Sequence, residues 1–262
     1  MRRLICLGFL LAMLAGCAGG APRAGEEQAL VDRATLTVQE MLGQGNDRLN
    51  AASMLRRARA VLVCPRIFRA GFLFAAEGGG CVLVARDAAG SWSSPAFYSL
   101  GSGSLGFQAG IQDLELMMMI MNDKALNAIL DSQFKFGADA SIAVATIGGS
   151  LEGATTAAVG ADIVAYARSR GLYAGISLQG SLLSYRSAWN RAYYGQDVGP
   201  RQIVVGMQVH NPGADPLRAV LMRYGSGGSA APPMAAPPSG AMAPVQTAPT
   251  GTVERTQLLP VR

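Results

Sequence analysis

The chain has 262 residues, of which 50% are hydrophobic and 15% are charged. This composition excludes a wholly disordered chain and suits one domain of ordinary size with tails, or two small domains. The formal net charge is +5, and the single histidine, His210, disfavours mechanisms that need a histidine base or a histidine-rich metal site.

The first residues are typical of a bacterial lipoprotein signal. Met1-Arg2-Arg3 is a short basic start, and Leu4 to Leu14 is an apolar run too short to cross a membrane as a helix. The run ends in Leu14-Ala15-Gly16-Cys17, which resembles the lipobox of lipoprotein precursors. We therefore expect residues 1–16 to be a signal peptide and Cys17 to carry the acyl chains, palmitate among them. The alternative is a plain secretory signal with Cys17 unmodified.

The residues after the cysteine bear on location. Ala18 follows Cys17, whereas an aspartate there would have resembled the inner-membrane retention signal of enteric lipoproteins. We therefore expect an outer-membrane lipid anchor that faces the periplasm. Residues 17–25 are expected to be a tether. Two or three acyl chains anchor a protein stably, because each buried methylene contributes about 0.8 kcal/mol.

Helical periodicity starts at Glu26. Leu30, Ala34, Val38 and Met41 form one apolar stripe, which predicts an amphipathic helix. Asn46 or Asp47 can cap a second helix, in which Leu49, Ala52 and Leu55 face one way. Further short helices are predicted after the cap Asn122-Asp123 as far as Leu130, over Ser181 to Tyr194, and over Asp215 to Tyr224.

Between these helices the pattern favours short strands. An apolar run from Ala60 to Cys64 is stopped by Pro65, and the turn Asp87 to Gly90 separates later strands. The other expected strands are 71–76, 80–86, 91–97, 114–121, 140–147, 162–167 and 172–178. Regular β-α-β alternation is missing. The prediction is therefore a single α+β domain over residues 26–224, with a mostly antiparallel, glycine-rich sheet, N-terminal helices and short flanking helices.

From residue 225 to 262 the chain changes character. Gly225 to Gly251 consists almost entirely of Ala, Pro, Gly, Ser and Met, without charge or period. We expect residues 225–262 to be a Pro/Ala-rich disordered tail. Such a tail can be a solvated end, or it can reach a protein partner in the envelope.

Two cysteines remain in the exported chain besides Cys17. Cys64 and Cys81 would stand in an oxidising compartment, where an even pair can form a disulfide. They fit equally well as two buried thiols in strands. Metal-ligand spacing is absent, so no metal site is expected.

Several motifs suggest catalysis or cofactor binding without a fitting context. Gly101 to Gly106 matches G-x-G-x-x-G, but no helix pattern follows, which favours glycine-rich bends in a curved sheet. Met117-Met118-Met119 would alternate between the two faces of a strand, so a doubly buried strand is favoured over a copper site. Asp113 and Glu115 share a strand face, but neither they nor His210 has a catalytic partner in the sequence. No catalytic residue, no enzyme activity and no cofactor are predicted.

The informative set is basic and aromatic. Guanidinium groups beside exposed rings suit an anionic lipid surface, because phosphates bind the guanidinium fork and the rings enter the interface. The alternative is that the rings belong to the core and that the arginines are ordinary surface charge. The candidate lipid-binding residues are Arg66, Arg69, Arg168, Arg170, Arg186, Trp189 and Arg191.

Several of these segments resemble, in order, the SYLF domain, a family found beside SH3 and FYVE modules in eukaryotes and in bacterial lipoproteins. The resemblance covers about residues 27–206. The matching stretches are 60–65, 70–72, 78–83, 92–97, 106–110, 137–140, 166–178 and 190–195. It implies one domain that binds phospholipid, phosphoinositides in eukaryotic members, with actin binding in some fungal members. Bacterial envelopes lack actin and usually lack phosphoinositides, so the lipids expected to bind here are anionic glycerophospholipids.

Three functions follow from the sequence as hypotheses. The first is an outer-membrane lipoprotein whose domain binds anionic phospholipid at the membrane. The second is a structural adaptor whose tail binds an envelope protein. The third, a hydrolase, lacks a nucleophile with a base nearby. Nucleic acid is not an expected partner.

Overall fold

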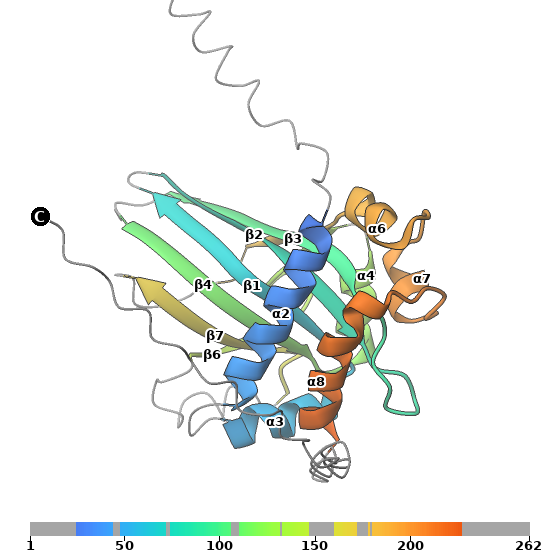
Figure 1. Ribbon diagram of the computed structural model, residues 1–262. Helices are drawn as coiled ribbons and strands as arrows, with labels where there is room; N and C mark the ends of the chain where they lie inside the picture. Colours follow the sequence, from blue (N-terminus) through green and yellow to red (C-terminus); the bar gives the residue numbers. More distant parts are fainter. Residues whose placement is uncertain are drawn as a thin grey trace, which may run out of the picture. The chain divides into compact units, whose positions relative to one another are not determined.

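The computed structural model describes residues 25–43, 48–71, 74–105, 110–131, 133–146, 160–171, 178 and 180–226. All of them belong to one compact unit. The elements, in chain order, are α2 (Glu26–Gly43), α3 (Arg48–Arg57), β1 (Ala60–Gly71), β2 (Phe74–Ala85), β3 (Ala96–Leu105), β4 (Gly110–Ile120), α4 (Asp123–Leu130), β5 (Gln133–Lys135), β6 (Ile142–Thr146), β7 (Ile163–Gly171), β8 (Leu182–Tyr185), α6 (Ser187–Tyr194), α7 (Pro200–Val204), η2 (Pro212–Ala214) and α8 (Asp215–Gly225). The expected single α+β domain is confirmed (Figure 1).

Some sequence predictions concern residues that the structure does not describe. The signal peptide 1–16, Cys17 and nearly all of the tether lie outside the described residues. The same holds for the tail beyond Ser226 and for almost all of the strand predicted over 172–178. No helix in the described part of the chain is long and apolar enough to cross a membrane.

One curled sheet organises the domain. Its strand order is β5-β8-β3-β2-β1-β4-β7-β6, and every pair is antiparallel except the parallel pair β6–β7. The short segment between edge strands β5 and β6 joins both sides of the curl. Phe136 N donates to Ser181 O next to β8, and Ile163 N of β7 donates to Ser141 O. The sheet therefore curls around one of its faces.

Each face of the sheet has its own apolar core. On one face, called here the α4 face, Leu62, Leu116 and Met118 pack with α4 and α7. On the opposite face, called the α2 face, Val63, Met117 and other strand residues pack with α2, α3, α8 and Trp189. In Figure 1, α2 and α8 lie side by side in front of the sheet. Burial on both faces explains the continuous apolar strands.

The helices follow their local sequence signals. All four residues of the stripe predicted in α2 are buried, and their i, i+4 spacing places them toward the sheet. In the second predicted helix, now α3, Leu55 is buried as expected, whereas Ala51 is buried in place of the predicted Ala52. Helix α4 begins after Asn122, whose side chain accepts a hydrogen bond from Ala125 N at 2.8 Å.

The prediction that Pro65 stops the first strand is wrong. Strand β1 continues to Gly71, and its pairing with both β2 and β4 changes register between Val63 and Phe68. A proline lacks an N–H donor, and a bulge is one of the few places where a central strand accepts it. The carbonyl oxygen of Arg66 at this bulge would lie 2.2 Å from a Cβ added at Gly79, so the neighbouring strand needs a glycine there.

Three further boundaries differ from the expected ones. Most of the two strands predicted over 71–76 and 80–86 forms the single strand β2 from Phe74 to Ala85, because its glycines pair regularly with β3, whereas Gly71 is the last residue of β1. The strand predicted over 91–97 is reduced to an isolated bridge between Arg86 and Trp92, and regular pairing begins only at Ala96, the first residue of β3. The helix predicted over Ser181–Tyr194 divides into β8 and α6, because residues 182–185 pair with β3 and β5.

Candidate functional site

The predicted arginines gather mainly at one end of the sheet. Gly71 pairs with both Ala75 and Gly110, and Gln112 pairs with Gly171, so β1, β2, β4 and β7 all approach the same edge, called here the hairpin end. Arg66 and Arg69 lie on β1 near this end. Arg168 and Arg170 lie on β7, and the side chain of Arg170 is outside the described residues.

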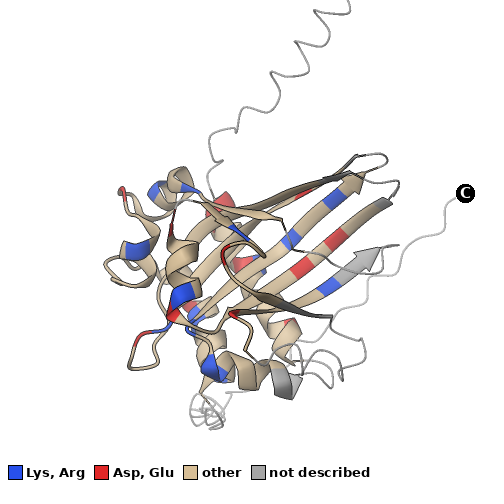
Figure 2. Cartoon of the chain, turned by 180° about the vertical axis from the view of Figure 1, so that it is seen from behind, with Lys and Arg blue, Asp and Glu red and all other residues tan. Residues whose placement is uncertain are grey.

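Most of these arginines are bound to carboxylates of the same chain. Arg66 Nε lies 2.9 Å from Asp113, and Arg69 lies 3.9 Å from Glu77. Arg168 contacts Glu40 of α2 and lies 2.5 Å from Glu115. The hydrogen bonds that Arg66 donates to the Asp113 carboxylate raise the pKa of Arg66 above its ordinary value, so this exposed guanidinium stays charged. Figure 2 shows basic positions on β1 and β7 on either side of acidic positions on β4.

The part of the α2 face nearest the hairpin end is open. Helix α2 crosses the sheet farther from the hairpin end, where the side chain of Leu30 lies against Gly80. Toward the hairpin end, the side chains of Phe68 and Ile111 are 43% and 67% exposed. The guanidinium of Arg66 lies 5.9 Å from the Phe68 ring centre. The open sheet patch, as named here, consists of Arg66, Phe68, Gly78, Gly103, Ile111 and Asp113.

The glycines of the open sheet patch are not required by packing inside the domain. A Cβ at Gly103 would meet nothing within 4 Å, and at Gly78 the nearest atom would be 3.6 Å away. Neither glycine has a positive φ. The patch is therefore flat and weakly polar, with an ion pair at one side, and its exposed Phe and Ile are available to an external surface.

The remaining predicted residues lie elsewhere. Trp189 of α6 is 8% exposed and packs against Phe97 in the core of the α2 face. Arg186 stacks on Trp189 at 3.7 Å, and burial lowers the pKa of Arg186. Across the sheet, Arg69 is level with Ser102 of β3, and Arg186 N donates to Phe97 O of the same strand. The five residues from Phe97 to Ser102 correspond to about 17 Å, at about 3.4 Å per residue. The structure thus does not bring Arg186, Trp189 and Arg191 to the hairpin end.

Arg191 also has its own acidic partner, because its guanidinium is 2.7 Å from Asp197. Of the candidate arginines whose side chains are described, Arg186 is in no salt bridge with a described carboxylate. Glu26 and Glu27 act on it only at longer range. The alternative from the sequence, that Trp189 belongs to the core, therefore describes this residue.

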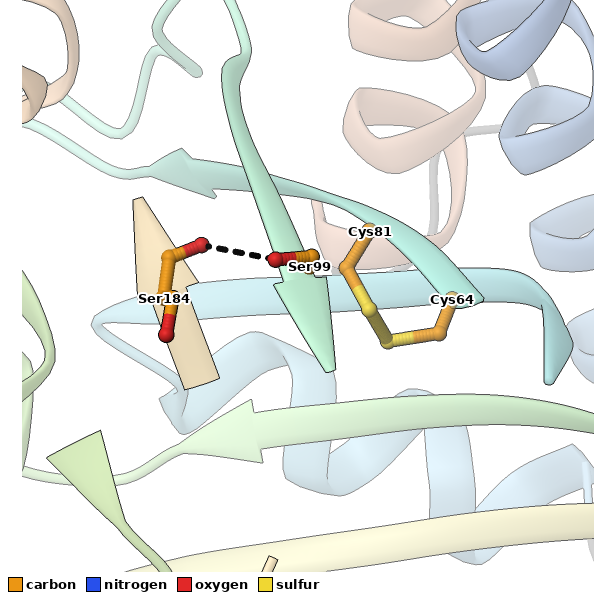
Figure 3. Close-up of a disulfide and its surroundings, with 4 residues drawn as sticks. All are labelled: Cys64, Cys81, Ser99 and Ser184. Carbon is orange, nitrogen blue, oxygen red and sulfur yellow. Dashed lines mark hydrogen bonds between the residues drawn. A yellow bond between two sulfur atoms is a disulfide. The ribbon is translucent and has the colours of Figure 1, made fainter. Parts of the chain in front are cut away.

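Cys64 and Cys81 form a disulfide, with an S–S distance of 1.98 Å (Figure 3). Their neighbours Val63 and Val82 are cross-strand partners, so the bridge joins β1 directly to β2. Both cysteines are fully buried on the α4 face. Beside them, the hydroxyl of Ser99 donates to the carbonyl oxygen of Ser184 at 3.5 Å, linking β3 to β8.

The residues considered for catalysis do not assemble into one site. Asp113 and Glu115 share the α2 face, as expected for residues two apart, but each carboxylate is held by an arginine. His210 is half exposed, and its Nε2 lies 3.6 Å from Asp215. In the described part of the chain, no hydroxyl or thiol group is hydrogen-bonded to His210. Among the same residues, no three His, Cys, Asp or Glu side chains come together as metal ligands.

A polar row on the α4 face was not predicted. Ser102, Glu77, Arg69 and Gln112 are successive cross-strand partners on β3, β2, β1 and β4. Directly opposite residues share a face, so these side chains form a row across an otherwise apolar surface. The signal was present in the sequence, because Gln112 is the polar member of the alternating set Gln112, Leu114, Leu116 and Met118.

Comparison with known proteins identifies relatives. Residues 101–224 match the family model described as "Ysc84: Las17-binding protein actin regulator". The SH3 domain-containing YSC84-like protein 1 of Bos taurus is 33% identical over 178 residues, covering 68% of this chain and 52% of that protein. Protein YSC84 of Saccharomyces cerevisiae is 29% identical over 180 residues, covering 68% and 38%. The chain therefore spans about half, or less, of the length of these relatives.

Proposed function

Since the chain belongs to the Ysc84 (SYLF) domain family, we propose that it is a non-catalytic, membrane-anchored lipoprotein of the bacterial envelope. In this proposal Cys17 carries the acyl chains, and the protein faces the periplasm from the outer membrane. The domain then binds anionic phospholipid head groups at the same membrane surface.

The observation that carries the proposal is the open sheet patch. It combines exposed Phe68 and Ile111 with the guanidinium of Arg66, which is paired with Asp113, at the end of one sheet. The transfer of aromatic and aliphatic side chains from water into a membrane interface is favourable, and arginine binds phosphate through its planar guanidinium group. The carboxylate partners limit the local excess of positive charge. A preference for anionic lipid would then come from ion pairs that exchange partners with phosphates, from Arg186, and from the net charge, which is +5 for the whole chain and +3 once Arg2 and Arg3 leave with the signal peptide.

Two further features agree with export and anchoring. The bridge between Cys64 and Cys81 is of a kind that forms in oxidising compartments and is rare in the cytosol. The distance along the chain from Cys17 to Gly25 is eight residues, which can extend over at most about 28 Å. A domain on so short a tether would stay close to the bilayer surface, so even a weak lipid contact would be strengthened by its high effective concentration.

Vesicle flotation tests the lipid contact of the domain. Residues 18–262, made without acyl chains and oxidised, should float with vesicles that contain phosphatidylglycerol. The bound fraction should rise with the share of phosphatidylglycerol and fall as salt is added, because exposed charges are screened over about 10 Å at 0.1 M salt. If this chain ignores such vesicles at low salt, the domain does not bind anionic phospholipid.

The mass of the amino-terminal peptide tests the anchor separately. The chain purified from a bacterial membrane should begin at Cys17 and carry the mass of its acyl chains, including palmitate. A Cys17→Ser chain should lose that mass, because serine has no sulfur to acylate. An unmodified Cys17 in the exported wild-type chain would refute the lipoprotein hypothesis.

A second candidate function is that of an adaptor that binds an envelope protein. The observation favouring it is that the family model is described as a Las17-binding actin regulator and that vertebrate relatives contain an SH3 domain, so relatives bind proteins. In this chain the partner would bind through residues 225–262. Deleting that segment separates the candidates: an adaptor loses its cross-linked partner, whereas vesicle binding by the domain is unchanged.

A further inference from the structure

The polar row on the α4 face contains a buried group without a partner. Gln112 is 3% exposed, and its side-chain Nε2 has no hydrogen-bond partner among the residues that the structure describes. Leaving a buried amide donor unsatisfied is destabilising, whereas a leucine would suit the apolar positions on either side of it. A bound ligand that accepts a hydrogen bond from Gln112 would offset this cost.

The neighbours of Gln112 define what such a ligand would carry. Arg69 is its direct cross-strand partner on β1, so a guanidinium group lies beside the amide donor. The next residue in the row is Glu77, whose side chain is 8% exposed. The row thus runs from a neutral donor through a cation to an anion across two strand spacings, each about 4.8 Å.

The contacts of Glu77 keep the carboxylate in place. Its Oε1 accepts hydrogen bonds from the hydroxyls of Ser102 at 2.6 Å and Ser181 at 3.5 Å. Its Oε2 lies 3.9 Å from Arg69, which is beyond hydrogen-bond distance. Glu77 is therefore positioned by the two serines through one oxygen, and its second oxygen forms a longer ion pair with Arg69.

We propose that the row Gln112–Arg69–Glu77 binds a zwitterionic head group that carries a phosphate and a primary ammonium. The phosphate accepts hydrogen bonds from Gln112 and Arg69, and the ammonium donates to Glu77. Phosphatidylethanolamine and free phosphoethanolamine share this chemistry. The inference goes beyond the proposed function, because this head group is zwitterionic and not anionic, and because its residues lie on the opposite face from the open sheet patch. The two can therefore fail separately.

Native mass spectrometry of the full-length chain in a non-ionic detergent tests the site. The probes are dihexanoyl-phosphatidylethanolamine, O-phosphorylethanolamine and dihexanoyl-phosphatidylglycerol. We expect one bound phosphatidylethanolamine per chain. Phosphatidylglycerol should bind at least about tenfold more weakly, because it has no ammonium group to donate a hydrogen bond to Glu77. Binding of O-phosphorylethanolamine with similar affinity would identify the free head group as sufficient, and its failure to bind would identify the lipid as the source.

The decisive variant is Gln112→Leu, with Gln133→Leu on the exposed edge strand β5 as its matched control. Without ligand, Gln112→Leu should raise Tm by about 2–4 °C, because an unsatisfied amide is removed. It should also bind phosphatidylethanolamine at least about tenfold more weakly, a loss that cannot be ascribed to misfolding. The control should change neither quantity.

Glu77→Gln tests the ammonium contact, because glutamine keeps acceptors for the two serine hydroxyls but loses the negative charge. This variant should bind phosphatidylethanolamine and phosphatidylglycerol equally. Undiminished phosphatidylethanolamine binding by Gln112→Leu, equal binding of both lipids by the wild type, or no binding of any probe would overturn the inference. Vesicle flotation that depends on Phe68 and Ile111 would stand even then.

Discussion

Replacing both Cys64 and Cys81 by alanine is expected to lower the free energy of unfolding by about 3 kcal/mol. The bridge spans a sequence separation of 17 residues. A cross-link that closes a loop of this size lowers the conformational entropy of the unfolded chain, which stabilises the folded state by about 3 kcal/mol. Domains of this kind have total stabilities of about 5–15 kcal/mol, so the loss would be a large part of the whole. Urea unfolding followed by circular dichroism measures it.

Chemical reduction supplies the control for the disulfide. A reductant should destabilise residues 18–262 of the wild type, in which Cys64 and Cys81 are the only cysteines, and should leave the double alanine variant unchanged. The bridge crosses the two central strands directly, so its loss affects the middle of the sheet. Equal urea midpoints for the oxidised and reduced wild type would contradict a stabilising disulfide.

Replacing both Phe68 and Ile111 by serine is expected to weaken vesicle binding by about 30-fold. Burying the exposed parts of these side chains in a membrane interface contributes on the order of 1 kcal/mol each, and about 1.4 kcal/mol corresponds to a tenfold change. Stability should change little, because the two side chains are already 43% and 67% exposed in the folded domain. Titration of the acyl-free chain with vesicles measures the change.

The matched control exchanges two other exposed apolar residues. Val205 and Met222 are 52% and 41% exposed and lie outside the open sheet patch. Val205→Ser together with Met222→Ser removes a similar amount of apolar surface and should leave vesicle affinity unchanged. If both double variants lose affinity equally, the effect comes from general hydrophobicity and the patch has no special role.

Local sequence signals predicted much of the fold. The stripe in α2, the Asn122 cap of α4 and the doubly buried methionines of β4 follow from periodicity and capping, which act over a few residues. The α+β class followed from many short strands between terminal helices. These features need no knowledge of which strands become neighbours.

Features that depend on strand neighbours were missed. Pro65 normally ends a strand, but pairing on both sides carries β1 past it through a bulge. The glycines of β2 have weak strand propensity, and residues 182–185 were predicted as part of a helix; both segments are strands because neighbouring strands pair with them. The parallel pairing of β6 with β7 likewise depends on the curl of the whole sheet.

The site was predictable only in part. The basic and aromatic sequence pattern includes Arg66, Arg69 and Arg168, which the fold brings to one end of the sheet. It also included Trp189 and Arg191, which belong to the core and to a separate ion pair. The carboxylate partners of Arg66 and Arg168 come from β4 and α2, far away in sequence, and Glu77 meets Arg69 across the β1–β2 pair, so only the folded sheet reveals them.

Fluorescence quenching by brominated phospholipids tests most directly whether the domain lies on the membrane through the open sheet patch. Two variants of the full-length chain, Ile111→Trp and Val205→Trp, would be reconstituted in vesicles. The wild type, whose tryptophans Trp92 and Trp189 are both buried, gives the background fluorescence. Lipids brominated in the acyl chains should quench the added fluorescence at residue 111 and leave that at residue 205 unaffected. Equal quenching at both positions, or none at residue 111, would contradict the account.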